Sequence, residues 1–521
     1  MERRLSEFFT GEIARQAGLI SRRGDADPLV TGLEYDSRKA GPGSLFFALP
    51  GLHADGHRYI AGAAAKGAAV IVHEADIDEQ APGLVYLQVR NSRFAMSPVS
   101  AAFYGFPSRR LIVTGVTGTE GKSTTVYLIF QLLRLLGKKA GFFSTVQYST
   151  GGEVQWNPEH QTTPEATTVQ RLLREMADNG CKYAVVEASS HGLSARTNRL
   201  GDVEFRAAVC TNVTHEHLEF HGTWEQYRDD KANLFRALDR YAPTKGPAPF
   251  GIINADDKSA DYFARATRQQ TLRFSVRGKD VELSLRAIES DSSGNWYDAF
   301  IAPKNDSIDI RDRLPGAFNA GNLFAALLVV RGLTGIPLGK IAPLAIRLRP
   351  VRGRMTAVAK GQPFELVVDY AHTPSSFRTI FPPLRERLSQ SGGRIISLFG
   401  SAGERDTRKR AEQGKIAAEY SDIIVLADED PRGEQPMDIL EEIAQGCEAD
   451  QSPAVFKREE NLFLIPDRPA AIRKALSLAK PGDLVLLLGK GHENSIIYAN
   501  RTMPYDEIAE AEKALSELGF A

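Results

Sequence analysis

A glycine-rich segment between residues 111 and 125 has the residue types that hold nucleotide phosphates. Its sequence, LIVTGVTGTEGKSTT, is an apolar strand-like run followed by a turn that ends in Gly121, Lys122 and Ser123. Backbone N–H groups of such a turn and the N-terminus of a following helix favour phosphates, the lysine reaches the terminal phosphates, and the serine can bind Mg²⁺. The usual G-x-x-x-x-G-K-[ST] pattern is only partly met, because Val116 takes the place of its first glycine. We predict a phosphate-binding loop between a strand and a helix, with a purely structural glycine turn as the alternative.

Three polar residues that follow the loop could complete an ATP site. Glu187 ends the apolar run YAVVE, His217 lies in THEHLEFHG, and Lys231 lies in the helical segment YRDDKANLF. An acid and a neutral imidazole can bind Mg²⁺ when phosphates supply the other oxygens, although histidine is unusual for so hard an ion. Taken singly, each residue would read more simply as a solvated polar side chain.

The elements that must position these residues are short, continuous apolar runs that end in polar residues. Two such runs, YAVVEASS and FRAAVCTNVT, follow the loop, and four more occur toward the C-terminus: ELVVDYAH, RIISLFGSAG, DIIVLADEDP and DLVLLLGKGHE. Apolar strands alternating with helices indicate a parallel sheet covered on both faces. Ligands of such sheets bind beyond the carboxyl ends of the strands, where each run places its polar cluster.

The length of 521 residues predicts three domains rather than one core. The Pro-containing link GFPSRR and the segment LRPVRGRM, around Arg349, mark the boundaries. We predict an α/β fold with three domains: a mixed α/β domain over residues 1–108, a mononucleotide-binding domain over 109–348, and a Rossmann-like domain over 349–521.

Composition excludes several classes of function. The 64 Lys and Arg balance 65 Asp and Glu to a net charge of −1, so nothing indicates a nucleic-acid partner. The scattered cysteines Cys181, Cys210 and Cys447 form neither a zinc motif nor a disulfide framework and fit a reducing compartment. No uncharged apolar run reaches the roughly 20 residues of a membrane helix, and the N-terminus lacks a signal-peptide core. We expect a cytoplasmic protein without membrane insertion; a monomer is plausible, and the oligomeric state stays open.

The loop and the segments after it resemble one enzyme family. GVTGTEGKST resembles the ATP loop of the Mur ligases and folylpolyglutamate synthetases, GTNGKTT, with Glu120 in place of the asparagine. EASSHGL and TNVTHEHLEFHGTWEQY resemble two further Mur-ligase segments, and Lys231 falls where that family carries a carbamylated lysine. The family joins a carboxylate to an amine through an acyl phosphate made from ATP. The resemblance therefore implies ATP, Mg²⁺ and a CO₂-derived carbamate on Lys231.

The same resemblance assigns roles residue by residue. LPGAFNAGNLFAA, RPVRGRM and VVDYAHTP match further family segments. The implied nucleotide-binding residues are Gly118, Thr119, Glu120, Gly121, Lys122, Ser123, Thr124, Asn319, Asn322, Asp369 and His372. The implied catalytic residues are Lys122, His217, Lys231 and Arg354. The implied metal-site residues are Ser123, Glu187, His217 and Lys231. An arginine near a transferring phosphoryl group can also neutralise developing charge, which gives Arg354 an independent reason.

The N-terminal segment narrows the donor substrate. EYDSRKAGPGSLFFALPGLHADGHRYI resembles the uridine-nucleotide segment of the family member that adds the third residue of the peptidoglycan stem peptide, and QTTPEA resembles its muramoyl-dipeptide segment. The implied donor contacts are Tyr35, Ser37, His53, Gln161, Thr162, Thr163, Ser189 and Arg199. Arg196 is the alternative to Arg199, because SARTNRL offers both arginines in a loop that is two residues longer than in the family.

Three C-terminal segments, GERD, EDPRGE and GKGHE, resemble the acceptor site of that enzyme. The implied acceptor contacts are Arg405, Asp430, Arg432, Gly489 and Glu493, with arginines on carboxylate and acids on ammonium. Arg432 favours meso-diaminopimelate, whereas Glu429 adds a negative charge that favours a distal ammonium, so lysine or ornithine stays an alternative.

The whole resemblance implies an ATP-dependent ligase that adds a diamino acid to UDP-N-acetylmuramoyl-L-alanyl-D-glutamate in peptidoglycan precursor synthesis. A folylpolyglutamate synthetase is the runner-up, which the DSR and TTPE segments disfavour. The loop alone would also permit an ATPase that acts as a nucleotide-driven switch.

Overall fold

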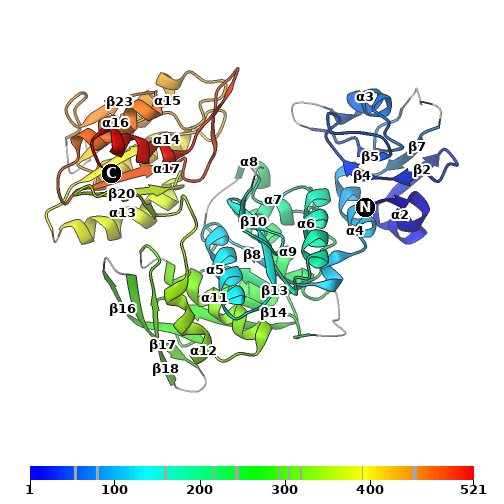
Figure 1. Cartoon of the computed structure of the whole chain (residues 1–521), viewed down its shortest axis with the longest axis horizontal. Helices are drawn as coiled ribbons and strands as arrows, with labels where there is room; N and C mark the ends of the chain where they lie inside the picture. Colours follow the sequence, from blue (N-terminus) through cyan, green and yellow to red (C-terminus); the bar gives the residue numbers. More distant parts are fainter. Residues whose placement is uncertain are drawn as a thin grey trace. The chain divides into compact units, whose positions relative to one another are not determined.

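The computed structural model describes residues 1–51, 55–77, 81, 83–157, 161–214, 218–240, 246–291, 294–302, 306–316, 319–389, 391–448 and 455–520. The chain separates into two compact units (Figure 1). One contains Met1–Ile288, Trp296–Arg311 and Ala320–Leu348. The other contains Glu289–Asn295, Asp312–Asn319 and Arg349–Ala521.

The N-terminal part of the first unit is a five-stranded sheet in the order β2-β7-β6-β5-β4. The strands are β2 (Leu19–Arg23), β4 (Gly32–Glu34), β5 (Ser44–Phe47), β6 (Val70–His73) and β7 (Val85–Val89), and β1 (Arg3–Arg4) pairs separately with β3 (Leu29–Val30). The helices are α1 (Leu5–Phe8), α2 (Gly11–Gln16), α3 (Ile60–Ala65) and α4 (Ser92–Phe103), with a 3-10 turn at Gly56–Tyr59. β4 to β7 are parallel, and only β2 is antiparallel to its neighbour. The inner strands β5 and β6 are mainly apolar and fully buried, as a sheet covered on both faces requires.

The rest of the first unit is built around an eleven-stranded sheet in the order β11-β10-β9-β12-β8-β13-β14-β15-β16-β17-β18. The strands are β8 (Ile112–Thr117), β9 (Ala140–Phe143), β10 (Gln147–Ser149), β11 (Gln155–Trp156), β12 (Tyr183–Glu187), β13 (Phe205–Cys210), β14 (Phe250–Asn254), β15 (Gln270–Ser275), β16 (Leu283–Asp291), β17 (Gly294–Ile301) and β18 (Asp306–Asp312). The six strands from β9 to β15 in this order are parallel. β8, which leads into the glycine-rich loop, therefore lies in the middle of the parallel region.

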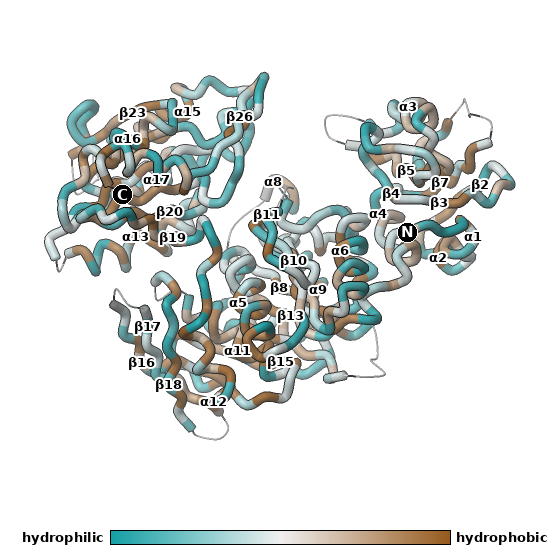
Figure 2. Tube along the Cα trace, viewed as in Figure 1, coloured by the Kyte–Doolittle hydropathy of each residue, from teal (hydrophilic) through white to brown (hydrophobic). Residues whose placement is uncertain are grey.

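The helices of this sheet cover its buried strands. They are α5 (Lys122–Leu135), α6 (Ala166–Asp178), α7 (Ser190–Leu193), α8 (Leu218–His221), α9 (Trp224–Ala237), α10 (Ala260–Arg265), α11 (Asn319–Thr334) and α12 (Leu338–Ile341), with 3-10 turns at Pro107–Arg110 and Ala342–Arg347. α6 and α9 supply Leu173, Met176 and Phe235 to a core that also contains Val113 and Val186 of the strands. Residues 323–330 of α11 are all apolar and fully buried, and the helix is largely hydrophobic in Figure 2.

Within the described residues, no single helix has the length and apolar composition to span a membrane. The pair Asn319–Thr334 and Leu338–Arg347 meets those criteria only together, with a bend of 112° at its break.

The second unit contains a six-stranded sheet in the order β19-β20-β24-β21-β22-β23. The strands are β19 (Thr356–Ala357), β20 (Glu365–Asp369), β21 (Ile395–Phe399), β22 (Ile423–Leu426), β23 (Leu462–Leu464) and β24 (Leu484–Leu488), and a separate hairpin joins β25 (Ser495–Ile497) to β26 (Thr502–Pro504). All neighbours except β19 are parallel. The sequence predicted four of these strands, β20, β21, β22 and β24, and their parallel arrangement is confirmed.

Helices cover both faces of this second sheet. They are α13 (Pro374–Ser389), α14 (Arg408–Tyr420), α15 (Pro436–Cys447), α16 (Arg468–Leu478) and α17 (Glu507–Glu517). Phe377, Ile416 and Ile439 place α13, α14 and α15 in one core. Ile472 and Ile508 place α16 and α17 in another. The predicted α/β class is thus confirmed.

Candidate active site

The glycine-rich loop runs from the end of β8 to the start of α5, as predicted. Gly118 and Gly121 adopt φ values of 149° and 80°, in the region that L side chains rarely occupy. A Cβ atom on Gly121 would also collide with the side-chain amide oxygen of Asn322. The structure thus brings Asn322 of α11 to the loop, although the two are far apart in the sequence.

The carboxyl end of β13 holds the loop in place. The backbone N–H of Glu120 donates to the Asn212 side chain at 2.9 Å, and the Thr211 hydroxyl donates to the Glu120 carbonyl at 2.6 Å. Lys122 folds back, and its Nζ donates to the Thr119 carbonyl at 2.7 Å. Sequence reasoning gave no role to Thr211 or Asn212, because their contacts come from sheet topology rather than from the loop motif.

Ser123 and Glu187 meet at the N-terminus of α5. The Ser123 hydroxyl donates to Glu187 Oε1 at 3.0 Å, and both side chains are buried. The backbone N–H of Thr145 donates to Glu187 Oε2 at 2.8 Å. A hydroxyl and a carboxylate are oxygen ligands of the kind that Mg²⁺ prefers, so this pair fits the predicted ion. Within the described residues, no group of three or more acids, histidines or cysteines is arranged to hold a metal ion, and His217 lies outside them.

Lys231 of α9 is buried beside the same loop. Its Nζ donates to the Gly118 carbonyl at 2.6 Å and lies 4.3 Å from the centre of the Tyr227 ring. The Tyr227 hydroxyl is 3.1 Å from that of Thr119, within the loop. The amine of Lys231 is therefore next to the predicted phosphate site.

A buried hydrogen-bonded trio joins α7 to α9. His221 Nδ1 is 2.7 Å from Asp230 Oδ2, and His221 Nε2 is 3.0 Å from the Ser190 hydroxyl. Because Asp230 precedes Lys231, this trio helps to fix the lysine relative to the segment that follows Glu187. The sequence offered no signal for it beyond the residues themselves.

The predicted donor segment packs against the end of β12. The Thr163 hydroxyl donates to the Glu187 carbonyl at 2.8 Å and accepts from the Ser189 N–H at 2.9 Å. Arg199 Nη1 donates to the Thr163 carbonyl at 2.7 Å, whereas the Arg196 guanidinium donates to the Phe220 carbonyl at 2.9 Å. The structure thus places Arg199, rather than Arg196, beside this segment.

The other predicted donor residues are spread over two sheets. Thr162 accepts from the Thr145 hydroxyl at 3.1 Å, and Gln161 is exposed. In the N-terminal sheet, Tyr35 packs against the core, and the Ser37 carbonyl accepts from Lys66 Nζ at 2.9 Å. His53 lies outside the described residues.

In the second unit, Arg354, Asp369 and His372 gather around Tyr370. Asp369 accepts from the backbone N–H groups of Met355 and Ala371, both at 2.7 Å. Burial raises the pKa of the Asp369 carboxyl, and the charge of Arg354 opposes that rise. The Arg354 guanidinium lies 4.6 Å from the centre of the Tyr370 ring, and His372 Nδ1 is 2.8 Å from the Tyr370 carbonyl.

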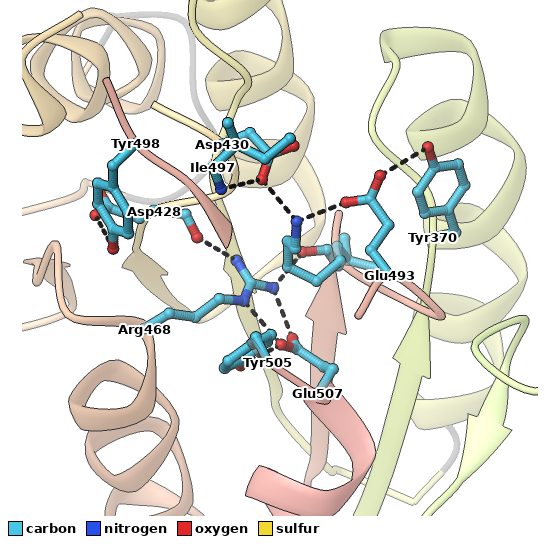
Figure 3. Close-up of polar contacts among 11 residues, drawn as sticks. Tyr370, Asp428, Asp430, Arg468, Glu493, Ile497, Tyr498, Tyr505 and Glu507 are labelled. Carbon is cyan, nitrogen blue, oxygen red and sulfur yellow. Dashed lines mark hydrogen bonds and ion pairs between the residues drawn. The ribbon is translucent and has the colours of Figure 1, made fainter. Parts of the chain in front are cut away.

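The predicted acceptor residues Asp430 and Glu493 are joined by a buried lysine (Figure 3). Lys490 Nζ donates to Asp430 Oδ1 at 2.9 Å and to Glu493 Oε2 at 2.6 Å. Burial alone would lower the pKa of Lys490, but Glu493 and Asp430 outweigh it and raise that pKa. Burial also raises the pKa of Glu493. Sequence reasoning did not assign Lys490, although a lysine between two glycines and near acidic motifs was a visible signal.

The three predicted acceptor segments meet at the carboxyl ends of β21, β22 and β24. The N–H of Gly403, in the GERD segment, donates to the Asp430 carbonyl at 2.8 Å. A Cβ on Gly489 would lie 3.0 Å from Glu429 Oε2. Arg432 has φ 54° and donates its N–H to the Ile497 carbonyl at 2.9 Å, while Arg405 is exposed. The arrangement is a charged site with acids, arginines and one internal lysine.

These features define an α/β protein with a phosphate-binding loop in one unit and a charged strand-end cluster in the other. Family descriptions match most of the chain. "Mur ligase family, catalytic domain" matches residues 29–104, "Mur ligase middle domain" matches 116–330, and "Mur ligase, glutamate ligase domain" matches 353–491.

Relatives of known sequence match almost the whole chain. A UDP-N-acetylmuramyl-tripeptide synthetase of Treponema denticola is 53% identical over 97% of this chain and 97% of its own. A UDP-N-acetylmuramoyl-L-alanyl-D-glutamate–2,6-diaminopimelate ligase of Geobacillus kaustophilus is 35% identical over 95% and 96%. Among solved structures, a UDP-N-acetylmuramoyl-L-alanyl-D-glutamate–2,6-diaminopimelate ligase is similar to this chain, with a TM-score of 0.62 and 24% sequence identity. The similarity covers 100% of both chains.

The chain belongs to the Mur ligase family. Members of this family are ATP-dependent, amide-bond-forming ligases, so the protein is an enzyme of that class that uses ATP. The alternative of an ATPase switch is therefore set aside.

Proposed function

We propose that the protein adds a diamino acid to UDP-N-acetylmuramoyl-L-alanyl-D-glutamate in peptidoglycan precursor synthesis. The names of the relatives support this substrate over a folyl substrate. The observation that carries the proposal is the strand-end cluster in the second unit, where Lys490 joins Asp430 to Glu493 and both arginine-bearing segments lie alongside. Such a site can bind the ammonium and carboxylate groups of an amino acid.

The reaction has two steps. A carboxylate oxygen of the donor attacks the γ-phosphorus of ATP, ADP leaves, and an acyl phosphate forms. The acceptor amine then attacks the acyl carbon and loses a proton, and the carbon–oxygen bond to phosphate breaks. We assign Lys122, with the loop N–H groups and Asn322, to the phosphates, and Arg354 to the charge that develops during transfer. Asn319, Asp369 and His372 remain proposed nucleotide contacts.

Mg²⁺ is the proposed metal, and Ser123 and Glu187 would hold it with phosphate oxygens. The bound ion would neutralise phosphate charge. We further propose that Lys231 carries a carbamate, which turns a cation beside the loop into an anion. Its support is the burial of Lys231 at the Gly118 carbonyl and its position in the family pattern.

The carbamate can be tested without an activity assay. Protein equilibrated with ¹³C-bicarbonate should show a carbamate carbon signal in NMR spectra, and Lys231→Arg should remove it. Lys139→Arg, at an exposed lysine in the same unit, should leave the signal unchanged. An absent signal in the unaltered enzyme, together with full activity of Lys231→Arg, would contradict the modification.

For the donor, we propose contacts from Tyr35, Ser37, His53, Gln161, Thr162, Thr163, Ser189 and Arg199. Arg199 is preferred to Arg196 because its guanidinium bonds the Thr163 carbonyl.

For the acceptor, we favour meso-diaminopimelate over lysine or ornithine. Glu429 Oε2 and Arg432 Nε are buried and have no hydrogen-bond partner among the described residues. A free carboxylate oxygen suits an ammonium, and a free guanidinium N–H suits a carboxylate. Of the three amino acids, only diaminopimelate carries both an ammonium and a carboxylate at the far end of its side chain.

The test compares kcat/KM for the three amino acids with one donor. Phosphate release should require both donor and diamino acid, and diaminopimelate should give the highest value. Arg432→Ala should lower kcat/KM for diaminopimelate by about tenfold or more, since a charged hydrogen bond contributes about 1.5–3 kcal/mol, and should affect lysine less. A large preference for lysine or ornithine would overturn the choice of acceptor but not the ligase function.

A further inference from the structure

Arg468, the first residue of α16, is a completely buried cation outside the predicted acceptor motifs. Its relative exposure is 0%. A cation at the N-terminus of a helix opposes the helix dipole, and a buried guanidinium loses its hydration. Neither helix formation nor core packing therefore explains an arginine at this position, so its partners must.

Two of those partners are carbonyl groups at the starts of the acceptor motifs. Arg468 Nη1 donates to the Asp428 carbonyl at 3.0 Å, and Nη2 donates to the Leu488 carbonyl at 2.7 Å (Figure 3). Asp428 directly precedes Glu429, and Leu488 directly precedes Gly489. One planar guanidinium thus spans the carboxyl ends of β22 and β24, which lie on either side of β21 in the sheet.

The ion-pair partner of Arg468 lies outside the acceptor motifs. Glu507, the first residue of α17, accepts from Nη2 at 2.6 Å and from Nε at 2.9 Å. The Tyr505 hydroxyl donates to the same carboxylate. Asp430 and Glu493 are consequently left for Lys490 and for substrate, although they lie close to this second buried ion pair.

The ion pair between Arg394 and Asp483 shows what an ordinary ion pair of this sheet looks like. Arg394, just before β21, bonds Asp483, just before β24, and also the carbonyl of Leu478 at the end of α16. It touches none of the proposed acceptor segments. Arg468 differs because its two carbonyl partners each stand one residue before a motif.

We propose that Arg468, neutralised by Glu507, is a positioning residue for the acceptor site. It fixes the spacing between the Glu429–Arg432 segment and the Gly489–Glu493 segment, so that groups from both can contact one diamino acid. This inference rests on the proposed function for the identity of the bound molecule. Errors of about 1 Å in such a site can cost about a hundredfold in rate, so a spacing role should be measurable.

The test uses the full chain with ATP, the UDP-muramoyl dipeptide and whichever of diaminopimelate, lysine and ornithine the unaltered enzyme uses best. The main variant, Arg468→Met with Glu507→Leu, removes both charges together, because a lone buried charge would destabilise the fold. Arg468→Lys keeps the positive charge but replaces the planar guanidinium, which donates to both carbonyls, with a single ammonium group. Arg394→Met is the control at the opposite end of the same sheet.

The double variant should raise KM for the diamino acid by about tenfold or more while KM for ATP stays within about twofold. For Arg468→Lys, KM for the diamino acid should lie between the values of the double variant and the unaltered enzyme. Arg394→Met should lower the melting temperature and leave KM for the diamino acid unchanged. Amide hydrogen exchange should speed up in both motif segments of the double variant but not of the control.

An unchanged KM for the diamino acid in a folded double variant would overturn the proposal, as would an equal rise in the control. If the double variant does not fold, KM for the diamino acid is measured on Arg468→Lys instead, and an unchanged value overturns the proposal. If the unaltered enzyme needs no diamino acid for phosphate release, the proposed function fails, and hydrogen exchange alone then decides whether Arg468 holds the two segments.

Discussion

At the scale of single residues, the notable feature of this protein is how many charged groups are buried in defined pairs. Glu187 bonds Ser123, and Lys231 bonds the Gly118 carbonyl. Lys490 lies between two acids, and Arg468 faces Glu507. Buried charges need partners because desolvation is costly. A side chain that is buried without a full set of partners is therefore informative.

Asp428 is such a residue, and it predicts a specific pH dependence. Burial raises its pKa from 3.8 to about 6, although the Tyr498 hydroxyl donates to it at 3.1 Å. Between about pH 4 and pH 6 the folded protein then binds this proton more tightly than the unfolded chain does, so stability falls as the pH rises through that range. Above it, the buried carboxylate is charged and destabilising.

Asp428→Asn should therefore raise the melting temperature at pH 8, by about 2 °C or more, and have little effect near pH 4.5. Thermal unfolding of both proteins at the two pH values measures this difference. A benefit that is equal at both values, or larger at the acidic one, would contradict the raised pKa.

At the scale of secondary-structure elements, strand ends organise both sites. β8 leads into the loop, β12 ends at Glu187, and β13 leads to Thr211. In the second unit, β22 and β24 lead into the acceptor segments. Because neighbouring strands are parallel, their carboxyl ends meet along one edge of each sheet. The turn from strand to helix then decides which backbone groups face the ligand.

Gly121 tests the role of that turn. Gly121→Ala should weaken ATP binding by about tenfold or more, because alanine at φ 80° is strained and its Cβ would collide with Asn322. Gly137→Ala, just beyond the other end of α5, is the control: its φ is 70°, but nothing lies within 4 Å of an added Cβ. KM for ATP measures the effect, and equal values for the two variants would refute the collision.

At the scale of the whole molecule, the chain consists of two units with separate hydrophobic cores. Leu133 of α5 is buried in the first unit, and Leu486 of β24 is buried in the second. Units with their own cores commonly unfold separately.

Calorimetry should accordingly resolve two unfolding transitions. Leu133→Ala should shift one transition to lower temperature, and Leu486→Ala should shift the other. Each substitution should reduce the free energy of unfolding of its own unit by about 2–5 kcal/mol, the usual cost of a leucine-to-alanine cavity. A single transition that both substitutions shift equally would show that the units unfold as one.

The class of fold could be predicted from local sequence patterns and is confirmed, and the same patterns predict a phosphate-binding loop in the first unit. Apolar runs ending in polar residues identified β12, β13, β20, β21, β22 and β24, because strand formation and burial leave a local pattern. The glycines and Lys122 identified the phosphate loop, because its backbone conformation needs glycine at Gly121. The family segments imply that Asn322 contacts the nucleotide, which stays a prediction, and the structure brings Asn322 to that loop.

Which residues lie together could not be predicted from local patterns, because it depends on the order of the strands in each sheet. β24 comes last among the parallel strands in sequence, yet it lies between β20 and β21, and this order brings Lys490 to Asp430 across 60 residues. Arg199 bonds the Thr163 carbonyl whereas Arg196 bonds the Phe220 carbonyl, and Arg468 joins two strand ends that no local pattern connects. These partners are set by the packing of distant elements, whose free energy depends on the whole sheet rather than on any one segment.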